Sequence, residues 1–410
     1  MVRGGRSRLA LLALAAISLL AGLWAGLVRL GWPLPGAALT PSHGPLLVAG
    51  VLGAIISLER AVALGQRWAY GAPAAAGLGG VALVVGAPAA LAAGLFAVGS
   101  LLVAVVFVRL FQRRPEWATA VMLAGALAWT ISNVLWLTER ATMELVPWWA
   151  AFLVLTIVGE RLELAQVLLS SRVRLALLGA TIVLGAGVVL SAALLFPGIQ
   201  VAGTGLLLLS AWLLRFDVAR RTVRRPGLAR FGAVSLLLGY VWLGVAGVIW
   251  LVGPSGFPGV FWYDAMIHSV FLGFVFSMIF GHAPTIVPAV TGIPVPYSRL
   301  FYVHVVALHG SLLVRVVADA TSSAEPRAWG GLANALTILL FAALTVRAAL
   351  DAARGTHQNH PVPVRRRDIS ARKAGQTSDA PTDARGNSEN QNLDVLRLSR
   401  PGAPLTGHPS

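Results

Sequence analysis

Two histidines, His43 and His268, have the clearest potential for chemistry in this sequence. Each lies near the start of a long apolar stretch, His43 within Ser42–Val48 and His268 within Asp264–Leu272. A polar side chain in such a segment is costly unless it has a partner, so ionisable residues there usually mark function. Neutral imidazoles are good metal ligands, and Asp264 stands one helical turn before His268, where a carboxylate can orient a ligating ring.

The composition implies that membrane helices position these histidines. The chain has 410 residues, of which 57% are hydrophobic and 12% charged, with a mean hydropathy of +0.77. Water-soluble domains have about 45–50% apolar and about 25% charged residues. The sequence therefore predicts an all-α polytopic membrane protein. It contains no cysteine, which excludes disulfides, thiolate metal sites, iron–sulfur clusters and cysteine nucleophiles.

Twelve apolar stretches have about the length needed to cross a bilayer, which takes roughly 20 helical residues. They are residues 9–29, 45–64, 72–88, 90–111, 117–138, 148–170, 174–196, 199–216, 230–252, 262–283, 299–318 and 329–350. Only a short turn separates the third stretch from the fourth, so an error of one helix in the count would fall there.

Arginines indicate the orientation of these helices. They precede the first stretch and recur at every second connection, whereas Arg29, Arg140 and Arg327 are single exceptions on the alternate connections. The recurring ones are Arg3, Arg6, Arg8, Arg67, Arg109, Arg113, Arg114, Arg172, Arg174, Arg215, Arg220, Arg221, Arg224, Arg225, Arg230 and Arg299. Because basic loops stay in the cytoplasm, both termini are expected there, in a bacterial inner membrane. The net charge of +16 is thus a topology signal, and no nucleic-acid partner is expected.

The two ends of the chain need separate interpretation. The basic start and apolar run of the first stretch also occur in signal peptides, but this run is too long and lacks a small-residue cleavage site, which favours a retained helix. Residues 1–353 are therefore predicted to form the transmembrane domain. Residues 354–410, rich in Arg, Asp, Ser, Asn and Pro, are predicted to be a disordered cytoplasmic tail.

With this orientation the buried polar residues fall into two layers. The outer layer contains His43, Asp264 and His268. The inner layer contains Glu59, Arg60, Glu160, Arg161, Glu163, His282 and His304. The alternatives for the outer pair are an interfacial His43 and a merely hydrogen-bonded interior His268. Glu59-Arg60 and Glu160-Arg161 are interpreted as ion pairs rather than proton carriers, because each glutamate has an arginine beside it.

The polar segments recur at a spacing of four helices, on the second, sixth and tenth stretches. In this the sequence resembles the large subunit of haem-copper oxidases and the twelve-helix NnrS-like proteins of the nitric oxide response. Ser42–Val48 is similar to the His-Gly ligand motif that begins their second helix, and Asp264–Leu272 to their tenth-helix segment. The resemblance implies three arcs of four helices and a haem b iron bound by His43 and His268, with Asp264 as a supporting partner.

The resemblance covers the twelve-helix plan and two short motifs. Met266 stands where the family has its high-spin haem histidine, and the sixth and seventh stretches contain no histidine. An oxygen-reducing centre with its copper ligands is therefore not expected. Glu160, His282 and His304 are candidate ligands of a second metal, such as copper, on the ground of their similar depth alone.

Three interpretations of the function remain open. The first is a haem-binding membrane protein, with or without copper, that transfers electrons or handles nitric oxide. Because haem-attachment cysteines, dinucleotide motifs and P-loops are absent, electrons would come from a quinone or another redox partner. The second is a proton- or cation-coupled transporter, suggested by Glu59, Glu160, Glu163 and His304. The third is a structural subunit; enzymatic activity and oligomeric state stay open.

Overall fold

The computed structural model describes residues 3–165, 169–253 and 259–358. These residues form helices joined by turns and short loops, and none of them lies in a β-strand. The predicted all-α architecture is therefore confirmed. The predicted tail lies outside the described residues from position 359 onward, and the last helix continues to Gln358, past the predicted domain boundary at residue 353.

Most of the apolar stretches form single long helices. These are α1 (Arg3–Arg29), α5 (Ala89–Arg113), α6 (Trp117–Leu137), α7 (Thr142–Ala165), α8 (Ser171–Ser191), α9 (Leu195–Phe216), α11 (Leu228–Val252), α14 (Phe301–Ala320) and α15 (Ala324–Gln358). The second and tenth stretches are composite. The second contains η1 (Ala37–Ser42), α2 (His43–Pro45), η2 (Leu46–Gly53) and α3 (Ala54–Leu64), and the tenth contains α12 (Gly259–His268), η6 (Ser269–Phe276) and α13 (Ser277–Thr291). A four-residue helix, α10 (Ala219–Thr222), lies between α9 and α11.

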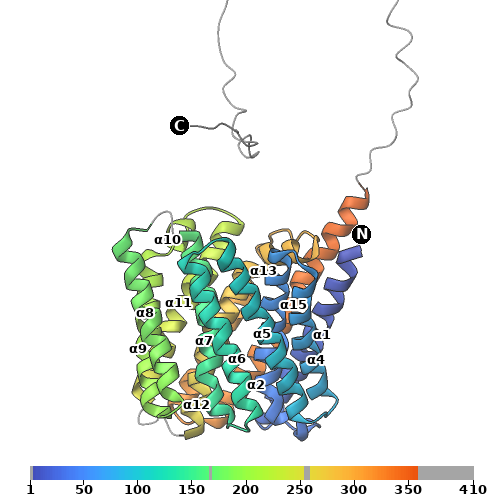
Figure 1. Ribbon diagram of the computed structural model, residues 1–410. Coiled ribbons are helices and arrows are strands. Elements are labelled where there is room, and N and C mark those ends of the chain that lie inside the picture. Colours follow the sequence, from blue (N-terminus) through green and yellow to red (C-terminus); the bar gives the residue numbers. More distant parts are fainter. Residues whose placement is uncertain (1–2, 166–168, 254–258, 359–410) are drawn as a thin grey trace, which may run out of the picture. The chain divides into compact units, whose positions relative to one another are not determined.

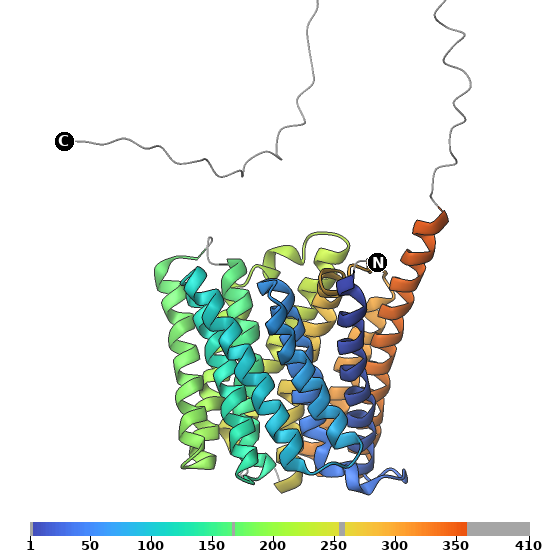
Figure 2. The ribbon, with the colours of Figure 1, turned by 45° about the vertical axis from the view of Figure 1, so that its right-hand side comes forward.

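The described residues include 11 helical segments that are long and apolar enough to cross a membrane. The remaining predicted crossing is α4 (Gly71–Val84), which has 14 residues and is preceded by the short helix η3 (Arg67–Tyr70). Helix α1 begins and α15 ends at the same end of the bundle, as Figures 1 and 2 show. The chain must then cross the bundle an even number of times, so α4 supplies the twelfth crossing. We call this common end the N-terminal end.

Helices that follow one another in the chain pack together as antiparallel neighbours. The most extensive contacts join α6 with α7, α8 with α9, α9 with α11, and α14 with α15. Among the membrane helices that the structure describes, α7 is the most enclosed, since 83% of its most apolar 18 residues are buried. Stacking of Phe152 on Trp129, with ring centroids 4.7 Å apart, fastens α7 to α6. The grouping into three arcs stays a prediction.

The two composite stretches share an unusual feature. Each contains a π-helical segment of eight residues, η2 after His43 and η6 directly after His268. In a π-helix each backbone N–H bonds to the carbonyl five residues earlier instead of four, and such segments occur frequently at functional sites. Both π-helical segments begin close to the end of the bundle opposite the N-terminal end.

Candidate functional site: a pair of histidines between two helices

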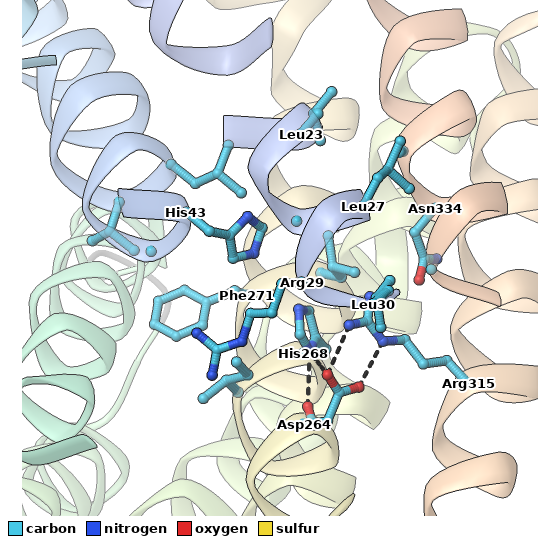
Figure 3. A pocket seen from close by; sticks show the side chains of 18 of the residues that line it. Leu23, Leu27, Arg29, Leu30, His43, Asp264, His268, Phe271, Arg315 and Asn334 are labelled. Carbon is cyan, nitrogen blue, oxygen red and sulfur yellow. Dashed lines mark hydrogen bonds and ion pairs between the residues drawn. The ribbon is translucent and has the colours of Figure 1, made fainter. Parts of the chain in front are cut away.

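His43 and His268 face one another across a pocket at the end of the bundle opposite the N-terminal end (Figure 3). Their ring centroids are 6.5 Å apart and the ring planes are inclined by 38°. His43 begins α2 and His268 ends α12, so the two rings come from the two composite stretches. The structure therefore brings together the two residues that the sequence placed at similar depth.

The hydrogen bonds of the two rings determine which nitrogen is free. The Nδ1 atom of His43 lies 2.7 Å from the carbonyl oxygen of Gly22 on α1, and Nδ1 of His268 lies 2.8 Å from the carbonyl oxygen of Asp264. A carbonyl oxygen only accepts, so each Nδ1 donates its proton. Each Nε2 then carries a lone pair, and neither has a hydrogen-bond partner among the described residues. A histidine that ligates a metal typically has this arrangement.

The separation of the rings fits a single ion between them. A metal–imidazole bond is about 2.0–2.1 Å long, and a five-membered ring with bonds near 1.35 Å has a radius of about 1.1 Å. Two imidazoles that bind one ion from opposite sides would thus have their centroids about 6.3 Å apart. The observed 6.5 Å agrees with this arrangement.

Apolar side chains form most of the pocket around the two rings. The cavity has a volume of about 140 Å³, which counts only the positions that the centre of a water molecule can occupy. Helices α1, α7, α14 and α15 line it together with the two composite stretches. Leu23 and Leu27 approach from α1 and Phe271 from η6 (Figure 3). Such walls exclude water from whatever binds between the rings.

Charged residues at the pocket leave a positive excess. Arg29, Arg315 and Arg327 line the pocket, and Asp264 is the one acidic residue that lines it. Arg315 neutralises Asp264, with Nε 2.6 Å from Oδ2 and Nη2 2.8 Å from Oδ1. The guanidinium carbon of Arg29 lies 5.8 Å from the ring centroid of Tyr263. Arg29 and Arg327 therefore remain as cations without an acidic partner lining the pocket, which suits a ligand that carries carboxylates.

Glycine allows α1 to pass close to the ring of His43. A Cβ atom at Gly26 would lie 2.6 Å from Cε1 and 2.8 Å from Nδ1 of His43. Since real side chains do not approach so closely, any larger residue would displace the ring or the helix. Gly44 lets the start of the second stretch lie against Trp149 of α7 in a similar way, with a Cβ atom 3.3 Å from Cζ3.

Comparison with known proteins places the chain in a family. Residues 8–350 match the model of a family described as a domain of unknown function, DUF8744. The chain belongs to the DUF8744 family. No curated protein matches it significantly, and no solved structure does. All residues of the histidine pair and its pocket fall within the matched range.

The inner polar layer of this DUF8744 protein forms ion pairs that differ in part from the predicted ones. Arg60 donates to Glu59, with Nη2 2.9 Å from Oε1, which confirms that pair, and it also donates to Glu160. The predicted pairing of Glu160 with Arg161 is wrong. Arg161 instead binds Asp217, with Nε 2.9 Å from Oδ2 and Nη2 3.1 Å from Oδ1. Glu160 and Arg161, neighbours on α7, thus each pair with a residue of another element, Arg60 of α3 and Asp217 at the end of α9.

The candidate ligands of a second metal are not gathered at one place. Among the described residues, no group of three or more His, Cys, Asp or Glu side chains is arranged to hold a metal ion. Nδ1 of His282 lies 2.8 Å from the carbonyl oxygen of Met278. His304 is buried among aromatic rings, with its centroid 4.7 Å from that of Phe280, and neither of its nitrogens has a hydrogen-bond partner. The structure thus does not bring His304 into a shared site with Glu160 and His282.

Sequence reasoning missed the arginines of the pocket. The sequence pointed to Arg29 and Arg327 only as exceptions to the distribution of basic residues, and Arg315 was not among the candidate residues. The signal was nevertheless present, because an isolated arginine on the arginine-poor side of a membrane protein needs a reason other than topology. Gly26 gave no such signal in a sequence so rich in glycine.

Proposed function

We propose that this protein binds a b-type haem between its second and tenth membrane stretches, where His43 and His268 would hold it, and that it serves electron transfer or the handling of nitric oxide. The observation that carries the proposal is the pair of imidazole rings with centroids 6.5 Å apart, each with its Nδ1 engaged by a carbonyl oxygen. When bound, the haem would supply a one-electron redox centre. A transporter has less support, since Glu59 and Glu160, two of the three glutamates on which it rested, are bound by Arg60.

The groups around the two histidines would position the rings and bind the haem in this proposal. The carbonyl oxygens of Gly22 and Asp264 orient the two imidazoles and fix the proton on Nδ1. Arg29 and Arg327 provide positive charge for the carboxylates of a haem, while the apolar walls keep out water. Because His43 and His268 would both be used to hold the haem, electron transfer is the simpler of the two roles.

The wider setting is part of the same proposal. The long apolar helices suit a lipid bilayer. The arginine distribution assigns the N-terminal end to the cytoplasm, which would place the histidine pair near the outer surface of a bacterial inner membrane. A quinone or another redox partner would exchange the electron. Copper binding stays part of the proposal, although the described residues include no group of three or more potential ligands arranged around one point.

An optical redox spectrum of the purified protein tests the haem directly. We expect the reduced-minus-oxidised bands of a bis-histidine b-type haem in the wild type. The variants His43→Ala and His268→Ala should each lose these bands or shift them to those of a five-coordinate haem. His282→Ala is the matched control, because its Nδ1 also bonds to the carbonyl oxygen one turn earlier and it lies outside the pocket.

Two results would remove the proposal. One is a correctly folded wild-type protein that shows no haem bands, even after expression with added haem precursor. The other is a haem spectrum that is unchanged when both histidines are replaced by alanine. Helical content measured by circular dichroism distinguishes the loss of a ligand from the loss of the fold in each variant.

A further inference from the structure

A second cavity lies at the N-terminal end of the bundle, where α8 begins and α9 ends. Its volume is about 440 Å³. Four arginines line it, namely Arg215, Arg220, Arg221 and Arg224, and we call it the arginine pocket. Its position and its charge separate it from the histidine pair at the opposite end.

The arginine pocket carries positive charge that the protein itself does not neutralise. Asp217 is the one acidic residue lining it, and it is already bound by Arg161 at 2.9 and 3.1 Å and by the backbone N–H of Ala219 at 2.7 Å. The guanidinium groups of Arg221 and Arg224 have no hydrogen-bond acceptor within the part of the chain that the structure describes. All four arginines are exposed, so their guanidinium groups are accessible to an anion.

Topology alone does not explain this concentration of arginine. The connection after α9 contains more basic residues than any other predicted connection, namely Arg215, Arg220, Arg221, Arg224, Arg225 and Arg230. The positive-inside rule needs an excess of basic residues on one side, but it does not need them to line a common cavity.

The chemistry of the pocket suits a phosphate group. The planar guanidinium group binds two phosphate oxygens at once, which makes arginine the preferred residue for this anion. The N-terminus of α8 adds to this, because Ser170 lines the pocket and accepts a hydrogen bond from Val173 N at 3.5 Å as the N-cap. Unpaired N–H groups and the positive end of the helix dipole there also attract anions.

The neighbouring surface indicates that the phosphate belongs to a lipid. On α9, Val201, Leu208 and Phe216 are 36%, 46% and 37% exposed. They are seven and eight residues apart and so lie along one side of the helix, which ends at the arginine pocket. Phe216 also lines the pocket itself. An acyl chain can follow this apolar stripe while its headgroup occupies the pocket.

We propose that the arginine pocket binds the phosphate headgroup of an anionic phospholipid, whose acyl chain lies along α9. The site is independent of the haem proposal. Basic pockets between membrane helices on the cytoplasmic side are suited to such headgroups. The bound lipid would hold the start of α8 against the end of α9.

The test compares two variants that lose the same charge at the same end of the bundle. In one, Arg221→Gln and Arg224→Gln are combined; neither side chain makes a hydrogen bond in the structure, so the fold should persist. In the control, Arg113→Gln and Arg114→Gln are combined at the connection after α5. The full-length protein in detergent receives phosphatidylglycerol, phosphatidylcholine or inorganic phosphate, and we measure its melting temperature and, by native mass spectrometry, the lipid that it retains.

Phosphatidylglycerol should raise the melting temperature of the wild type and the control, and should remain bound to both. The Arg221/Arg224 variant, with unchanged helical content, should lose the shift and the bound lipid. Equal losses in both variants would mean general attraction between charges and would overturn the proposal. It would equally be overturned if phosphatidylcholine acted as well as phosphatidylglycerol, or if inorganic phosphate alone produced the full shift.

Discussion

Arg315 holds Asp264 through two parallel hydrogen bonds, from Nε to Oδ2 at 2.6 Å and from Nη2 to Oδ1 at 2.8 Å. The pair joins α14 to α12 one helical turn before His268, whose Nδ1 bonds to the carbonyl oxygen of Asp264. The position of the His268 ring thus depends on a contact between two helices. Within the proposed function, Asp264 and Arg315 act on the ligand and not on the iron.

Replacement of Asp264 by Asn should destabilise the protein. Arg315 would lose the carboxylate that accepts both of its hydrogen bonds, and breaking a buried ion pair from one side costs about 3–5 kcal/mol. The melting temperature of the variant in detergent should fall clearly below that of the wild type. The double variant Asp264→Asn/Arg315→Gln should recover part of the loss. A single variant as stable as the wild type would contradict the role given to this pair.

Replacement of Gly26 by Ala should disturb His43 without removing any ligand. The added Cβ atom would lie 2.6 Å from Cε1 of His43, and overpacking of this kind costs about 1–3 kcal/mol. We expect a lower haem content per protein and an altered spectrum. Gly94→Ala is the control, because nothing lies within 4 Å of a Cβ atom there. If both variants bound haem like the wild type, the close packing of α1 on His43 would not matter for the site.

The buried pair of Arg161 with Asp217 should contribute far more to stability than a surface pair. Their side chains are 7% and 0% exposed, so Arg161→Gln leaves a buried carboxylate without its partner at a cost of about 3–5 kcal/mol. Arg140, which is 53% exposed and pairs with Glu144 at 2.9 Å, is the comparison. Arg140→Gln should change the stability by less than about 1 kcal/mol. Thermal unfolding of both variants measures the difference, and equal effects would refute it.

Replacement of His304 by Phe should leave the protein as stable as before or more stable. Both ring nitrogens of His304 are buried without partners, and the neighbouring rings of Phe280 and Phe341 would accept another aromatic side chain. Removing an unsatisfied buried polar group gains about 1–3 kcal/mol. The variant also tests the second metal, since loss of a bound metal on this substitution, measured by elemental analysis, would assign His304 a ligand role that its surroundings do not suggest.

Much of the architecture could be predicted because hydrophobic length is a local property. Each apolar stretch by itself predicted a helix. The number of helices was least certain at the turn between the third and fourth stretches, which is where the short helix α4 ends. The π-helical segments η2 and η6 could not be predicted, because they depend on packing between helices and not on their own apolar residues. The partner of Arg161 was missed for the same reason, since Asp217 lies on a different element.

The sequence by itself determined that the chain forms membrane helices and that His43 and His268 lie on the same side of the bundle. Hydropathy and the distribution of arginine are properties of the linear sequence, so both could be read without the structure. Only the tertiary structure decided that the two rings face each other at 6.5 Å, with Nδ1 engaged and Nε2 free. It also decided that Arg29 and Arg327 share their pocket and that His304 does not. The rotation of each helix about its axis sets these relations. That rotation follows from the packing of all the helices together.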